Sequence, residues 1–186
     1  MRRVHVDQSI ASVEIELGYP AAGFREEMTQ NLRQLIKTAV PELQQINIDI
    51  RWRIAAHASQ SKAPPMRRVS NLIAIASGKG GVGKSTTAVN LALALTAEGA
   101  RVGLLDADIY GPSLPMMMGV PADARPDTRD QKYFVPMSAH CVQLISMGVL
   151  VTDSTPMVWR GPMASGALQQ LLNQTLWEDL DYLIVD

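Results

Sequence analysis

The chain has 186 residues, of which 47% are hydrophobic, and its 17 lysines and arginines against 18 aspartates and glutamates leave a net charge of −1. This nearly even balance of charge argues against a polybasic protein that wraps nucleic acid or binds a membrane surface. No apolar run approaches the roughly 20 residues of a membrane span, and acidic residues interrupt the stretch where a secretory signal would lie. The single cysteine, Cys141, excludes an intrachain disulfide and, alone, a structural zinc site or an iron–sulfur cluster. We therefore expect a soluble, cytoplasmic protein.

The first 55 residues predict a small α+β domain of β-α-β type. Residues 10–17 and 46–54 alternate apolar and polar side chains, as strands with one solvated face do. Residues 22–38 carry apolar side chains at helical spacing, and a proline follows shortly after. Residues 56–70 have no hydrophobic period and contain two prolines, which is typical of an interdomain linker.

Residues 71–186 predict a second domain with a mostly parallel α/β sheet. Four apolar runs, at 72–76, 102–105, 142–146 and 183–185, are expected to be buried strands, the first of them covered by helices on both faces. An Ala/Leu-rich helix is expected at about 85–98. The long segment 107–140 is rich in Pro, Gly, Met and Asp, so it should be functional or disordered.

The chain stops at Asp186, directly after an apolar strand. We therefore expect a piece of a longer protein, truncated at this strand, with an incomplete sheet. The strand at 71–76 or its neighbour should then present an uncovered apolar edge, and the piece alone should be poorly soluble.

A glycine-rich loop lies between the first predicted strand and the predicted helix of this domain, and it fits the pattern G-x-x-x-x-G-K-S/T. Glycines let consecutive backbone N–H groups turn inward around phosphate oxygens, and the helix N-terminus adds positive potential. Lys84 should reach the β- and γ-phosphates and the Ser85 hydroxyl should bind Mg²⁺. The predicted nucleotide-binding residues are Gly78, Lys79, Gly80, Gly81, Val82, Gly83, Lys84, Ser85 and Thr86.

The same loop also fits the dinucleotide pattern G-x-G-x-x-G through Gly78, Gly80 and Gly83, with Asp106 at a plausible distance for a ribose contact. That pattern gives no role to a lysine and a serine directly after its last glycine, whereas Mg²⁺–triphosphate binding needs both. The phosphate loop is therefore the favoured interpretation.

Lys79 is a second lysine in the loop, which the ordinary motif does not require. Its side chain either stays solvated or places a cation on a γ-phosphate, such as that of a partner subunit, where it would stabilise developing charge as an arginine finger does.

Three aspartates follow predicted buried strands, where ligands bind in parallel sheets. Asp106 is predicted to orient Mg²⁺ or its waters, and Asp108 to position the attacking water. The alternative for this pair is helix capping or loop solvation. Asp186 has the placement of the acid that holds Mg²⁺ in phosphate-loop enzymes; its alternative is a chain-terminal carboxylate in solvent. Lys79, Lys84 and Asp108 are the candidate catalytic residues, and Ser85, Asp106 and Asp186 the candidate Mg²⁺ ligands.

The loop with its two lysines resembles that of the deviant Walker A ATPases, which include MinD, ParA, the nitrogenase iron protein and the Mrp/ApbC group. Residues 106–113 (DADIYGPS), residues 158–163 (VWRGPM) and the small domain at the front narrow the resemblance to Mrp/ApbC, the cytosolic iron–sulfur cluster carriers of bacteria.

This resemblance implies an ATP- and Mg²⁺-dependent hydrolase that works as a homodimer, with Lys79 reaching the partner's nucleotide and Lys84 and Ser85 binding their own. It implies that Asp106 and Asp108 belong to the first switch region and Asp186 to the Walker B strand. Cluster donors and apoprotein recipients, rather than nucleic acid or membrane, are the implied partners. The 4Fe-4S cluster would be held by a Cys-x-x-Cys pair that this chain lacks, so no iron–sulfur ligand is assigned here. The alternatives are a MinD/ParA-type positioning switch and a nucleotide-binding fragment without activity.

Overall fold

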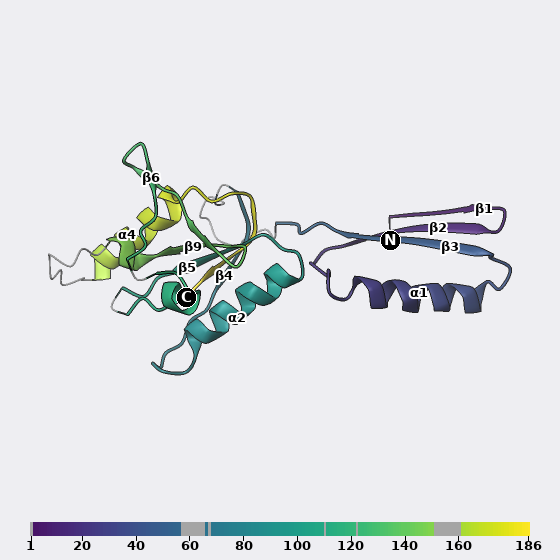
Figure 1. Ribbon diagram of the computed structural model, residues 1–186, viewed down its shortest axis with the longest axis horizontal. Helices are drawn as coiled ribbons and strands as arrows, with labels where there is room; N and C mark the ends of the chain where they lie inside the picture. The colour runs from purple at the N-terminus through teal and green to yellow at the C-terminus, as the bar shows by residue number, and fades with distance from the viewer. Residues whose placement is uncertain (1, 57–65, 67, 110, 122, 151–160) are drawn as a thin grey trace. The chain divides into compact units, whose positions relative to one another are not determined.

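The computed structural model describes residues 2–56, 66, 68–109, 111–121, 123–150 and 161–186. The chain divides into two compact units, which are described separately (Figure 1). The first consists of Met1–Ala55 with Ala97–Gly99, and the second of Ala56–Thr96 with Ala100–Asp186. Most of the predicted linker at 56–70 lies outside the described residues, and its last two residues belong to the first strand of the second unit.

The first unit is a three-stranded sheet with one helix. In chain order its elements are β1 (Arg3–Asp7), β2 (Ile10–Leu17), α1 (Arg25–Ala39) and β3 (Gln45–Trp52). β2 lies in the middle, antiparallel to β1 and parallel to β3. β1 was not predicted from the sequence, and with it the order of elements is β-β-α-β rather than β-α-β. The alternation of Val4 and Val6 with charged neighbours is the signal that would have revealed this strand.

The core of the first unit is small. Its buried cluster consists of Ala11, Leu43 and Ile46, against which Ile36 of α1 and Ile48 of β3 pack. α1 has no fully buried residue, although its apolar side chains follow the spacing that the sequence predicted. The Lys37 ammonium ties the end of the helix to the following turn by donating to the carbonyl oxygens of Pro41 and Leu43.

The second unit is built on a five-stranded sheet in the order β4-β10-β5-β9-β8, in which only the edge strand β8 is antiparallel to its neighbour. Its strands are β4 (Val69–Ala74), β5 (Val102–Asp106), β8 (Met137–Ala139), β9 (Val142–Ser146) and β10 (Leu180–Val185). The other elements are α2 (Lys84–Ala97), α3 (Leu114–Met117), the hairpin of β6 (Thr128–Arg129) and β7 (Tyr133–Phe134), the 3-10 helix η1 (Met147–Leu150) and α4 (Gly161–Gln174).

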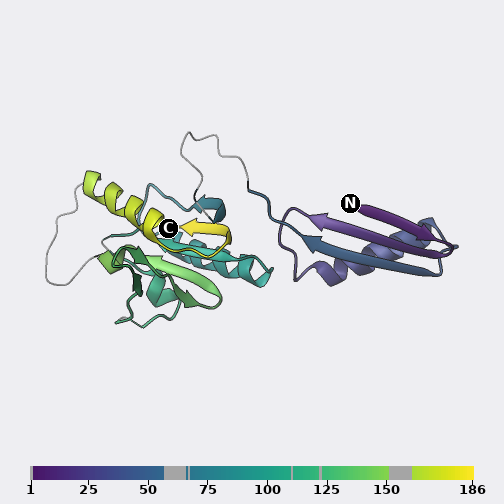
Figure 2. The same ribbon diagram turned by 90° about the horizontal axis from the view of Figure 1, so that it is seen from above.

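Helices α2 and α4 cover opposite faces of this sheet (Figures 1 and 2). The connection through α2 runs from β4 to β5 and the one through α4 runs back from β9 to β10. Because both crossovers are expected to be right-handed, opposite directions place the helices on opposite faces. α4 was not predicted from the sequence, and the segment 107–140, expected to be functional or disordered, contains α3, β6, β7 and β8.

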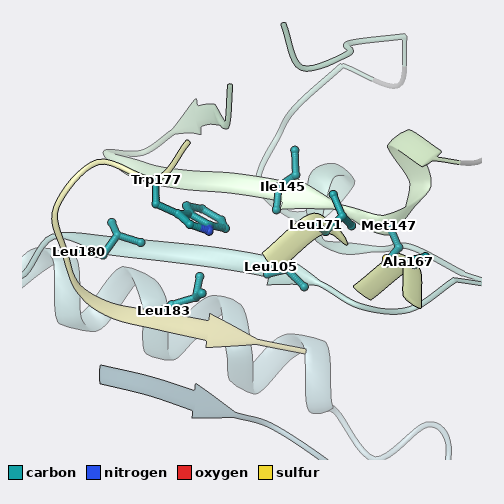
Figure 3. Packing of buried hydrophobic residues seen from close by; sticks show 8 residues of the cluster. All are labelled: Leu105, Ile145, Met147, Ala167, Leu171, Trp177, Leu180 and Leu183. Atoms are coloured by element: carbon teal, nitrogen blue, oxygen red, sulfur yellow. The ribbon is translucent and has the colours of Figure 1, made fainter. Parts of the chain in front are cut away.

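One part of the core of the second unit lies between the central strands and α4 (Figure 3). All five residues of β5 are buried. The cluster on the α4 side consists of Leu105, Ile145, Met147, Ala167, Leu171, Trp177, Leu180 and Leu183. Gly103 makes this packing possible, because a Cβ atom at that position would lie 2.5 Å from Leu180 Cδ1 and 3.1 Å from a ring carbon of Trp177. The central strands therefore form the rigid frame of the unit.

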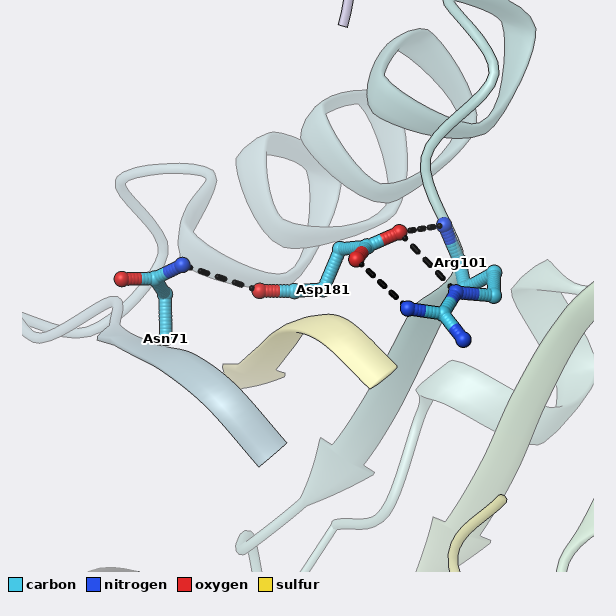
Figure 4. Close-up of polar contacts among 3 residues, drawn as sticks. All are labelled: Asn71, Arg101 and Asp181. Atoms are coloured by element: carbon cyan, nitrogen blue, oxygen red, sulfur yellow. Dashed lines mark hydrogen bonds and ion pairs between the residues drawn. The ribbon is translucent and has the colours of Figure 1, made fainter. Parts of the chain in front are cut away.

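A polar clamp joins three strands at the end of the sheet where they begin (Figure 4). The Arg101 guanidinium donates to Asp181 through Nε (3.2 Å) and Nη2 (2.9 Å), and the Arg101 backbone N–H donates to Asp181 Oδ2 (2.9 Å). Asn71 Nδ2 donates to the Asp181 carbonyl oxygen (3.2 Å). Burial alone would raise the pKa of the Asp181 carboxyl, but the hydrogen bonds and charge of Arg101 outweigh it and lower that pKa.

The expected burial of the strand at 72–76 is wrong. β4 lies at the edge of the described sheet, where β10 is its partner, and Leu72 is 50% exposed. An apolar run predicts burial on both faces only for a strand with neighbours on both sides, which the local sequence cannot reveal. In the part of the chain that the structure describes, no helix is long and apolar enough to cross a membrane.

Candidate nucleotide-binding site

The glycine-rich loop connects the end of β4 to the first residue of α2, as its motif predicts. Gly81 and Gly83 adopt positive φ angles of 72° and 88°, which favour glycine over residues with side chains. Thr87 closes the first helical turn, because its N–H and its hydroxyl both donate to Gly83 O (2.9 Å each). The N–H groups of residues 80–86 make no hydrogen bond to any other described residue. They are therefore available to phosphate oxygens at the N-terminus of a helix.

The two lysines of this loop have different settings. Lys84 begins α2 and is half-buried, whereas Lys79 is exposed on the loop, and its N–H donates to Ser77 Oγ (3.1 Å). Neither ammonium group forms an ion pair with a residue that the structure describes. Two unpaired cations beside a ring of free amides make a strongly anion-attracting loop.

Asp106 is fully buried at the end of β5, and both of its carboxylate oxygens are engaged. Oδ1 accepts from the Asp108 N–H (3.1 Å) and Oδ2 from the Leu114 N–H (3.0 Å). Burial is the largest effect on its pKa and raises it, aided by the charges of Asp186 and Asp108, while the two hydrogen bonds act in the opposite direction. Asp106 thus holds both ends of the loop that follows β5. The predicted contact of Asp106 with Mg²⁺ or its waters stays a prediction.

Asp108 lies on that loop with an exposed side chain, and Asp108 Oδ1 accepts from the Gly111 N–H (3.1 Å). The carboxylate therefore has a defined position while remaining accessible to solvent. That combination suits a group that orients a water molecule.

Asp186 follows β10, the strand between β4 and β5. Its backbone continues the sheet, since its N–H donates to Leu105 O (3.0 Å) and its carbonyl oxygen accepts from Ala107 N (2.9 Å). Both side-chain oxygens are buried and have no hydrogen-bond partner among the described residues. A buried carboxylate without a partner is costly unless a cation or donor completes it.

These residues fit Mg²⁺ bound together with a nucleotide. Asp186 supplies an orphaned carboxylate, and the hydroxyl of Ser85 at the start of α2 supplies a second hard oxygen. Among the described residues, no three His, Cys, Asp or Glu side chains gather as a metal cage. Mg²⁺ commonly takes one or two protein ligands and completes its shell with phosphates and water.

The predicted site residues lie at or just after the carboxyl ends of three neighbouring strands: the loop after β4, Asp186 after β10, Asp106 at the end of β5 and Asp108 after it. The sequence analysis did not single out Ser146, which ends β9 in register with Asp106 and is 2% exposed. A polar residue closing an apolar strand, the signal that revealed Asp106, would have identified it as well. Gly148, two residues later, was not predicted to have a role either.

A family model described as ParA, NUBPL iron-transfer P-loop NTPase, matches residues 68–186. The chain belongs to this family. It is 61% identical over 139 residues to the iron–sulfur cluster carrier protein of Pseudomonas fragi, an alignment that covers 75% of this chain and 48% of the relative. It is 43% identical over 186 residues to that of Haemophilus influenzae, covering 100% of this chain and 50% of the relative. These relatives support the resemblance to the Mrp/ApbC group.

Among solved structures, the chain is similar to a nucleotide-binding protein in complex with ADP from Archaeoglobus fulgidus, at 30% identity and a TM-score of 0.54. That match covers 64% of this chain and 45% of the other. The family and this neighbour confirm the predicted α/β P-loop NTPase fold. The chain spans about half the length of the curated relatives it matches.

Proposed function

We propose that this chain is the nucleotide-binding part of an ATP-hydrolysing iron–sulfur cluster carrier. The proposal depends on one observation. The free backbone N–H groups of residues 80–86 and the orphaned carboxylate of Asp186 follow neighbouring strands of the same sheet. A triphosphate and its magnesium ion together complete both. That the cargo is an iron–sulfur cluster is inferred from the relatives, which are named iron–sulfur cluster carrier proteins.

In this mechanism the backbone N–H groups of the loop bind the phosphate oxygens, and the Lys84 ammonium neutralises charge on the β- and γ-phosphates. Ser85 and Asp186 would hold Mg²⁺, which would supply positive charge against the phosphate oxygens. Asp106 fixes the loop after β5 by accepting from its two ends. Asp108 on that loop orients the attacking water toward the γ-phosphate.

We further propose that the working form is a cytoplasmic homodimer in which Lys79 reaches the nucleotide of the partner subunit. The exposed Lys79 side chain, which forms no ion pair among the described residues, supports this role. The cluster, of 4Fe-4S type, would be bound and passed to apoproteins by the longer protein, since this chain's single cysteine cannot ligate it alone.

The test measures the Kd of Mg-ATP by titration calorimetry in the unchanged protein, in Lys84→Ala and in Lys132→Ala. Lys132 is a matched control because its ammonium lies over the Tyr133 ring, outside the proposed site. We expect Lys84→Ala to weaken Mg-ATP binding at least tenfold, since a charge-assisted phosphate contact is lost, while Lys132→Ala has no effect. Equal affinity of the unchanged protein and Lys84→Ala would refute the nucleotide site.

The cargo is tested separately in the longer protein, by iron and sulfide analysis after anaerobic cluster reconstitution. Changing the cysteines outside these 186 residues should abolish cluster binding, whereas Cys141→Ser should leave it intact. A cluster that survives the first change would refute ligation by those cysteines, and failure of the unchanged longer protein to bind a cluster would refute the carrier role; neither result would touch the nucleotide site.

A further inference from the structure

The loop after β5 is anchored at both ends on one carboxylate. Asp106 accepts from the N–H of Asp108 through Oδ1 and from the N–H of Leu114 through Oδ2. Within the loop the Gly111 N–H donates to Asp108 Oδ1. Pro112 follows Gly111 directly, so any displacement of Pro112 moves the group that holds the Asp108 carboxylate.

Pro112 rests on the turn that ends β9. A Cβ atom added to Gly148 would lie 3.0 Å from Pro112 Cγ and 3.5 Å from Pro112 Cβ. Contacts at this lower limit leave no room for a side chain unless the proline ring moves. A side chain at residue 148 would therefore displace Pro112 from its present position.

The turn at residues 146–148 is held by a hydrogen bond and by the packed core. Ser146 is 2% exposed, and its hydroxyl accepts from the Gly148 N–H (3.1 Å). Met147 between them is fully buried in the core cluster with Leu105 and Leu171 (Figure 3). Ser146 is also in register with Asp106 across the β5–β9 pair. The turn cannot retreat from Pro112 without disturbing the packed core.

We propose that residues 146–148 form a seat for the loop after β5, and that Gly148 is a positioning residue for Asp108 in ATP hydrolysis. The inference rests on the proposed function and deepens it, since it names what sets the position of the residue that orients the attacking water. The path runs from Gly148 to Pro112, then through the Gly111 N–H to Asp108 Oδ1. Gly148 and Pro112 do not belong to the phosphate-binding loop at residues 78–86, so we expect their substitution to affect hydrolysis more than nucleotide binding.

The experiment compares Gly148→Ala and Gly148→Val with Gly166→Ala in the hydrolytically active protein. Gly166 in α4 is the matched control because a Cβ atom there would meet nothing within 4 Å. We expect kcat for Mg-ATP to fall about threefold in Gly148→Ala and at least about tenfold in Gly148→Val, since small misplacements of a reacting group are costly. The Kd for Mg-ATP should stay within about twofold, and Gly166→Ala should hydrolyse normally.

A second-site change separates positioning from damage to the fold. Pro112→Ala removes the ring carbon nearest to residue 148, so combining it with Gly148→Ala should raise kcat above that of Gly148→Ala alone. Unchanged kcat in Gly148→Val would overturn the inference, as would a parallel loss of kcat, Mg-ATP affinity and thermal stability without rescue. Absence of hydrolysis in the unchanged protein would instead refute the ATPase itself, and with it this role.

Discussion

The two units of this chain use their strands in different ways. In the first unit β2 and β3 each bury one face against a helix that has no fully buried residue of its own. In the second unit β5 is buried at every position, and helices cover both faces of the sheet. Every predicted catalytic or Mg²⁺-binding residue lies in the second unit. A site that must hold phosphate and carboxylate groups within fractions of an ångström benefits from a frame whose central strands are packed on both faces.

The largest expected effect comes from truncating a core side chain in each unit. Leu183→Ala removes a fully buried side chain from the centre of the second unit's cluster and should cost about 3–5 kcal/mol of unfolding free energy. Ile46→Ala, in the smaller cluster of the first unit, should cost less, about 2 kcal/mol, because its surroundings are already partly open to solvent.

Amide hydrogen exchange would measure both, because it reports the opening free energy of each unit separately. Leu183→Ala should accelerate exchange in β5 and β10 and leave β2 and β3 unchanged. Equal losses of opening free energy in the two units would contradict the difference in packing described here.

The sequence could predict the second unit's site because its chemistry is local. The residues from Gly78 to Thr86 carry their own backbone preferences, and an acid after an apolar run is placed at the carboxyl edge of a parallel sheet wherever that strand pairs. The engagement of both Asp106 oxygens by the following loop could not be predicted, because it depends on how residues 108–114 fold back. The sequence predicted an uncovered apolar edge at residues 71–76 or the neighbouring strand, yet the burial expected from the apolar run at 72–76 was wrong, since burial depends on which strands are neighbours.

The next effect concerns the polar clamp where the strands of the second unit begin (Figure 4). The pKa of Asp181 is lowered in the folded chain, so the clamp stabilises the fold fully above the unfolded value of about 4 and is lost as the pH falls through the folded pKa. Asp181→Asn should cost about 1 kcal/mol at neutral pH, a modest figure because the Arg101 side chain is 60% exposed.

Urea unfolding of the two proteins between pH 7 and pH 3 provides the measurement. The difference in unfolding free energy should be constant from pH 7 to about pH 5 and should shrink as the solution is acidified further. Asp49→Asn is the control, because the Asp49–Arg51 pair in the first unit is exposed on both sides and should contribute little. A difference that grows on acidification would show that the sign of the pKa shift is wrong.

The smallest effect on stability, and the sharpest contrast between the units, is expected at their edge strands. β1 and β4 each form an edge of the described sheets and each expose an apolar side chain, Val6 at 55% and Leu72 at 50%. β1 carries Arg3 and Asp7, whereas β4 has no charged residue to discourage pairing with another chain.

Leu72→Lys should therefore slow aggregation of the 186-residue chain several-fold, as measured by light scattering at 37 °C. The same substitution should change the unfolding free energy by no more than about 0.5 kcal/mol. Val6→Lys is the matched control and should leave the aggregation rate nearly unchanged, because the β1 edge is already protected. If both substitutions slow aggregation equally, general surface charge rather than the open edge of β4 controls the solubility of the chain.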